Sequence, residues 1–113
     1  MINAGQIGEI LSLYKKHGWN LRRVLLSETL KKRLANASEE LFGAAEIVSS
    51  DIDAAWFSRA SRKTHEAWEL RHLSETPFAL FEAFDGEVEE TEREEIRRQM
   101  EDRLGKLLSR DRN

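Results

Sequence analysis

The pattern Ala-Trp-x-x-Arg occurs twice in close succession, at 55–59 and again at 67–71. The two copies flank a short polar segment, 61–64, that contains neither glycine nor proline. Apolar segments around a short polar one are typical of the two arms of an antiparallel β-hairpin. Because a hairpin has two faces, the register of its arms decides which tryptophan enters the core and which stays on an open sheet face.

The length of 113 residues predicts a single domain, 1–113, with one hydrophobic core. The absence of cysteine excludes disulfides and thiolate catalysis. The first residues lack the basic start and apolar run of a signal peptide, and no apolar run approaches the roughly 18 residues of a membrane span. We therefore expect a cytoplasmic protein without a membrane partner.

Charge is unevenly distributed along the chain, whose formal net charge is -3. Basic residues gather at 15–33, and acidic residues gather at 82–95. Such a dipolar chain can steer a charged partner or draw two copies together. The acidic balance lacks the basic footprint of a nucleic-acid-binding domain and disfavours nucleic acid as a partner.

Helix signals are clear near both ends of the chain. Asn3 and Gln6 form a capping box before an apolar stripe, and Gly18 supplies a stop. Ser27 predicts a second helix through about residue 37, with a further helical turn at 38–43. A closing helix begins with the capping box Thr91-x-x-Glu94, and its apolar stripe consists of Ile96, Met100, Leu104, Leu107 and Leu108.

Four segments are predicted as strands on their apolar, aromatic and β-branched content: 19–26, 51–60, 65–73 and 78–84. A bulge is expected at Arg22-Arg23 in the first, and 44–50 is ambiguous. The element order is therefore α-β-α-β-β-β-α. It predicts an α+β fold of two layers, with an antiparallel sheet of three to four strands packed against helices.

A four-residue loop at 61–64 fixes a register in which Phe57 faces Trp68. A second four-residue loop at 74–77 sets Leu70 opposite Phe81. The face on this side is almost wholly apolar and is the predicted core, because a one-residue slip would mix polar and apolar positions. Its residues are Ala55, Phe57, Trp68, Leu70, Ala79, Phe81 and Ala83.

The opposite face of the same hairpin is mixed in character and is the predicted binding surface. Trp56 lies there across from Glu69, and Glu69 lies across from Glu82. This face can be covered by the second helix, paired with a second copy or used to bind a partner. Tryptophan and arginine are enriched at binding hot spots. The expected binding residues are Trp56, Glu69, Arg71, Leu80 and Glu82.

The leading functional hypothesis is a non-enzymatic module that binds a protein partner or a second copy of itself. An alternative is a small enzyme in which Glu69 and Glu82 share a proton or hold a divalent cation while Arg71 binds an anionic group. No phosphate-binding glycine loop, HExxH or nucleophile elbow occurs, and the three histidines lack metal-ligand spacing. We therefore expect no cofactor, no metal and no assigned catalytic residue.

The order α-β-β-β-α from Asp51 to Leu108, with Asp53 on one strand and Glu69-Leu70-Arg71 on the next, resembles the PD-(D/E)xK nuclease superfamily. The resemblance implies that Asp53 and Glu69 are metal-binding acids. Arg71 stands at the position of the family's lysine and is a poor activator of water because it stays protonated. A degenerate nuclease domain is therefore a further alternative.

The predicted hairpin tip carries a basic cluster beside the aromatic residues Trp56 and Phe57. Basic and aromatic residues together are the composition used to bind single-stranded nucleic acid. The residues for this alternative are Arg59, Arg62, Lys63 and His65.

Overall fold

The computed structural model describes residues 2–110, and its first element is the helix α1, Ala4–Lys16. The predicted capping box is confirmed: the side chains of Asn3 and Gln6 each accept a hydrogen bond of 2.9 Å from the backbone N–H of the other. Gly18 follows the helix with a φ of 85°, a conformation that favours glycine. The chain then turns into strand β1, Asn20–Leu26.

Two short helices and a short strand follow β1. Ser27 caps helix α2, Glu28–Leu34, by accepting a hydrogen bond from the Leu30 N–H. The predicted extension of this helix to residue 37 is wrong, because the chain leaves it at Ala35 with a φ of 46°. Helix α3, Ala37–Phe42, ends at Gly43 as predicted. The ambiguous segment 44–50 contains strand β2, Glu46–Ser49.

Three strands and a long helix complete the chain: β3, Ala54–Arg62, β4, His65–His72, β5, Ala79–Asp85, and α4, Glu90–Arg110. The helix begins one residue before Thr91, so Thr91 lies inside α4 and is not its N-cap. Within residues 2–110, no helix combines the length and the apolar character that crossing a membrane requires.

The strands form one sheet in the order β2-β1-β3-β4-β5. β1 and β2 are parallel, whereas the other neighbours are antiparallel. Residues 2–110 therefore contain four helices and a five-stranded mixed sheet, which confirms the α+β class. The prediction of three to four antiparallel strands is wrong because α2 and α3 form a crossover that returns the chain parallel to β1. The predicted bulge in β1 is confirmed between Leu21 and Arg23.

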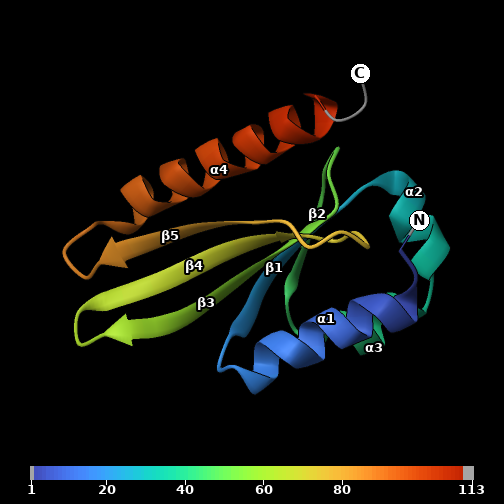
Figure 1. The fold of residues 1–113 in the computed structure, drawn as a ribbon, viewed down its shortest axis with the longest axis horizontal. Coiled ribbons are helices and arrows are strands. Elements are labelled where there is room, and N and C mark those ends of the chain that lie inside the picture. The colour runs from blue at the N-terminus through green and yellow to red at the C-terminus, as the bar shows by residue number, and fades with distance from the viewer. Residues whose placement is uncertain (1, 111–113) are drawn as a thin grey trace.

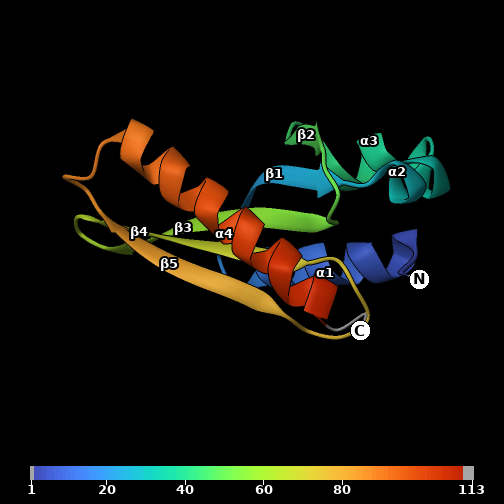
Figure 2. The ribbon, with the colours of Figure 1, turned by 90° about the horizontal axis from the view of Figure 1, so that it is seen from above.

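Helices lie on both sides of the sheet, with α4 on one side and α1 on the other (Figures 1 and 2). The core on the α1 side draws its strand residues from β1 and β3, including Val24 and Phe57. The core on the α4 side includes Leu104 and the strand residues Leu70 and Phe84. The fold thus has three layers, not the two that were predicted.

The register of the hairpin differs by one residue from the prediction. β3 continues to Arg62, which pairs with His65 across a two-residue turn, and Ala60 pairs with Glu66. Relative to the predicted loop, the two-residue turn shifts the pairing by two residues. Ser61, between these pairs, is the extra residue of a bulge and takes back one, so every pair before it differs by one residue from the prediction. Trp56 therefore pairs with Leu70, and not with Glu69.

The register of β4 with β5 is shifted in the same way. The chain between these strands spans residues 73–78, longer than the predicted four-residue loop, and Leu70 pairs with Leu80. Glu82 consequently pairs with Trp68, and Glu69 pairs with Phe81. Because successive residues of a strand point to opposite faces, the predicted core face is wrong, and its members divide between the two sides of the sheet.

Candidate functional site

Part of the sheet on the α1 side has no apolar cover. The apolar core on this side takes no residue from β4 or β5. In Figure 1, α1 lies along the β1 side of the molecule, away from β5. We call the part of these two strands that lies beyond this core the open face. It consists of the exposed β5 residues Ala79, Phe81 and Ala83 and of the less exposed β4 residues Glu69 and Arg71.

Phe81 is the most exposed large apolar side chain described, at 58%. It lies on β5 between two further exposed residues of the open face, Ala79 and Ala83. Across the sheet, Phe81 pairs with Glu69 and Ala79 pairs with Arg71. The open face therefore has an apolar outer row on β5 and a charged inner row on β4.

The inner row is anchored to α1 through Tyr14. The Tyr14 hydroxyl donates a short hydrogen bond to the Glu69 carboxylate, and its ring stacks on Phe57 with centroids 4.0 Å apart. Burial, followed by the hydrogen bond to Glu69, raises the pKa of Tyr14, while the nearby Arg71 charge opposes this shift. Tyr14 therefore stays protonated as a donor and is not a general base at neutral pH.

Arg71 is almost buried, at 8% exposure, yet no ion pair with it is found in residues 2–110. Its guanidinium donates to the backbone carbonyl of His72. It also lines a small cavity of about 280 Å³ beside α1, together with Leu13, which is 55% exposed. The same cavity is also lined by the carboxylates of Glu9 and Glu75, so its wall is mixed in charge and not purely apolar.

Only two of the five predicted binding residues, Glu69 and Arg71, lie on the open face. Trp56, Leu80 and Glu82 lie on the other side of the sheet, which faces α4. The expectation that Trp56 is exposed is wrong: it is fully buried, and its indole N–H donates to Glu101 at 2.8 Å. Its burial follows from α4, which covers this side of β3 with Met100 and Leu104.

Glu69 and Glu82 do not form a carboxylate pair. They lie on opposite faces of the sheet because Glu82 pairs with Trp68, the residue next to Glu69, and neighbouring residues of a strand point to opposite faces. Glu69 accepts from Tyr14, whereas Glu82 is half-buried on the α4 side. The geometry assumed for a shared proton or cation between these two residues is therefore wrong.

The two acids that the nuclease resemblance singles out have different partners. Asp53 accepts hydrogen bonds from the Ser27 N–H at 2.6 Å and from the Ser27 hydroxyl at 3.1 Å. Glu69 instead accepts from Tyr14. In the described part of the chain, no group of three or more acidic or histidine side chains is arranged to hold a metal ion.

The basic cluster does gather at the hairpin tip, but two of its members have partners. Arg59 donates to the carbonyl of His17 and lies 4.6 Å from the Trp19 ring centroid. His65 lies 3.8 Å from Asp85. Lys63 is exposed, and the side chain of Arg62 lies outside the described structure.

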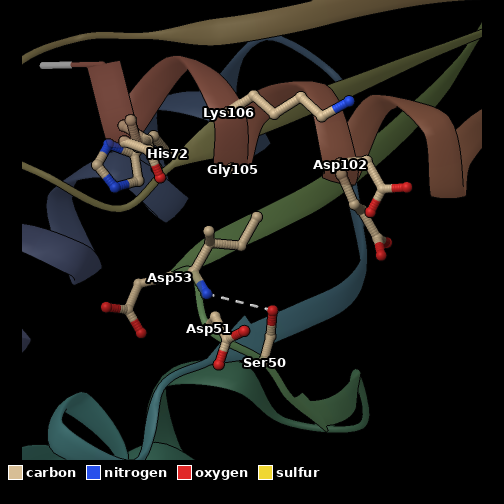
Figure 3. A pocket seen from close by; sticks show the side chains of 11 residues that line it. Ser50, Asp51, Asp53, His72, Asp102, Gly105 and Lys106 are labelled. Carbon is tan, nitrogen blue, oxygen red and sulfur yellow. Dashed lines mark hydrogen bonds between the residues drawn. The ribbon is translucent and has the colours of Figure 1, made fainter.

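A cleft of about 730 Å³ lies between the β2–β3 loop and α4 (Figure 3). Asp51 and Asp53 line its loop side, and Asp102 and Lys106 line its helix side. His72 completes one end, and burial lowers its pKa, as does the Arg71 charge, although Asp53 opposes the shift. The cleft has charged walls but no convergent ligand set.

The chain matches no family model, no curated protein and no solved structure in comparisons with known proteins. Its function is therefore inferred from the geometry of its own residues.

Phe81 is the functional candidate that sequence reasoning missed, because the predicted register placed it in the core. Leu13 was also missed. Its position outside the apolar stripe of α1, which includes Ile10 and Tyr14, was a signal that it faces solvent. For Phe81 the signal was weaker: β5 is the last strand, and last strands often form sheet edges.

Proposed function

We propose that the chain is a non-enzymatic self-association module that pairs with a second copy through β5. The observation that carries this proposal is the 58% exposure of Phe81 on a strand that ends the sheet. In the described part of the chain, no strand pairs with the outer side of β5. A free edge offers N–H and C=O groups that extend a sheet readily.

The backbone of β5 favours this pairing. The His72 N–H donates to the Phe78 carbonyl at 2.9 Å, so Phe78 directs its backbone groups toward β4. Alternation along an antiparallel strand then directs the backbone groups of Ala79, Phe81 and Ala83 outward. These residues also carry the exposed apolar side chains. One set of residues therefore supplies both hydrogen bonds and apolar contacts.

Glu82 restricts the register between two copies. A pairing centred on Glu82 sets two carboxylates opposite each other, which is destabilising. A pairing centred on Phe81 instead sets Phe81 against its copy, Ala79 against Ala83, and Leu80 against Glu82. This arrangement is closed and two-fold, so the apolar rows of both copies bury each other. Arg71, beside this row, is available to a carboxylate of the second copy.

The test is the molar mass of the protein, measured by size-exclusion chromatography with light scattering over a concentration series. The wild-type chain is expected to be a dimer. Phe81→Glu is expected to have the molar mass of a monomer and to keep the circular dichroism spectrum of a folded chain. Ile47→Glu is the matched control, because Ile47 is 40% exposed on β2 at the opposite edge of the sheet. This control should remain a dimer.

A wild-type monomer at every concentration would overturn the proposal. So would a dimer that survives Phe81→Glu, or one that Ile47→Glu disrupts equally.

A further inference from the structure

The side chain of Arg97, on α4, has a buried nitrogen without a hydrogen-bond partner. This atom, Nη1, is the one buried side-chain nitrogen or oxygen in residues 2–110 of which this is true. The residue is 3% exposed, and its guanidinium carbon lies 4.3 Å from the Trp68 ring centroid. Nε and Nη2 donate to Glu94 at 3.1 and 2.7 Å, and Nη2 also donates to Glu90. Because a buried donor without an acceptor is destabilising, this nitrogen calls for an explanation, and a bound acceptor group would supply one.

A cavity of about 360 Å³ adjoins this guanidinium. It is lined by Trp68 and Glu66 of β4, by Glu46 of β2 and by charged residues of β1 and α4. Its volume is at the lower end of the roughly 300–1,000 Å³ typical of small-molecule sites. Arg22, on β1, is exposed and lies 5.7 Å from the Trp68 ring centroid. No ion pair with Arg22 is found in residues 2–110. Arg22 and Arg97, two arginines with unused hydrogen-bond donors, therefore both lie close to the indole ring of Trp68.

The other charges around the cavity are paired. Arg23 lies 3.0 Å from both Glu46 and Glu94, and Arg93 lies 3.3 Å from Glu66. Burial alone would raise the pKa of Glu94. The hydrogen bonds from Arg23 and Arg97, together with their positive charges, outweigh this effect and lower the pKa, so the carboxylate stays ionised. These pairs leave the cavity close to neutral.

Glu90 differs from the other glutamates around the cavity. Its side chain is 73% exposed, it begins α4, and its ion pair is with Arg97. An exposed side chain at the first residue of a helix can turn into solvent without loss of core packing. The carboxylate of Glu90 therefore occupies a position beside Arg97 that the carboxylate of a ligand can take instead.

We propose that this cavity binds a small organic carboxylate, held by Arg97 and Arg22 in the place that Glu90 occupies. The exchange of one carboxylate for another leaves the charge of the site unchanged. A guanidinium binds a carboxylate through two parallel hydrogen bonds, and the largely buried indole of Trp68 contributes an apolar part to the wall of the cavity. The site does not rest on the proposed self-association, because Trp68 lies on the α4 side of the sheet.

Isothermal titration calorimetry with benzoate, at constant ionic strength, tests this site. The wild-type chain is expected to bind benzoate and not the neutral analogue benzamide. Glu90→Gln removes the carboxylate that competes with the ligand for Arg97 and should tighten benzoate binding at least about tenfold. Arg22→Gln removes one of the two arginines and should weaken benzoate binding about tenfold. Glu92→Gln is the matched control, because Glu92 is an exposed acid in the same helical turn and does not line the cavity.

Four results would overturn the proposal. They are an absence of benzoate binding by both the wild-type chain and Glu90→Gln, equal binding of benzamide, an equal effect of Glu92→Gln, and inorganic phosphate binding as tight as that of benzoate. The Phe81→Glu variant should bind benzoate like the wild-type chain, which separates this site from the proposed dimer.

Discussion

The indole of Trp56 meets the indole of Trp68 edge-on, with ring centroids 6.0 Å apart and planes at 71°. Both tryptophans lie in the core beneath α4, at 0% and 7% exposure. The two copies of Ala-Trp-x-x-Arg thus contribute their tryptophans to one side of the sheet. Both tryptophans therefore belong to the structural core on the α4 side, and neither lies on the open face of the α1 side.

Substitution of either tryptophan by alanine should destabilise the fold. Trp56→Ala is expected to lower the free energy of unfolding by about 3 to 5 kcal/mol, because it removes a fully buried ring and leaves Glu101 without its donor. Trp68→Ala should be comparable, whereas Trp19→Ala, at a half-buried site, should cost less. Urea denaturation measures all three. A fold unaffected by Trp56→Ala would contradict the assignment of this residue to the core.

Tyr14 should ionise at a higher pH in the folded chain than in the unfolded chain. It is the only tyrosine, so an alkaline titration followed by tyrosinate absorbance reports this residue alone. Its pKa is raised above the usual 10.0, so its contribution to stability is complete below pH 10 and is lost as the pH rises further. Coincident titration curves in buffer and in denaturant would contradict the buried Tyr14–Glu69 hydrogen bond.

Stability should fall as the pH is lowered below about 6.5 because of His72. Its pKa is lowered in the folded chain from the usual 6.5, so the unfolded chain binds a proton first as the pH falls. The loss begins near the unfolded pKa and is complete below the folded one. His72→Gln should make the free energy of unfolding less dependent on pH in this range. An identical pH dependence in wild type and variant would refute the role of His72.

Both ends of α1, the start of α2 and the approximate positions of four of the five strands could be predicted from local chemistry. Asn3 with Gln6 marks the start of α1, Gly18 its stop and Ser27 the start of α2, because each satisfies backbone groups within a few residues. The apolar stripe of α4 likewise faces its core as its spacing predicts, with Met100 and Leu104 buried. These features involve neighbours in sequence, and propensity and periodicity are sufficient to place them.

Tertiary structure alone decided the register, and with it the candidate site. In β3, Ala54 and Trp56 face one core while Ala55 and Phe57 face the other. A strand that is apolar on both faces does not specify its register by pattern, so a single bulged residue, Ser61, can move every side chain to the other side. The packing of α4 on one side of the sheet and of α1 on the other settles the choice, because only contacts between distant segments distinguish two faces that are equally apolar in sequence.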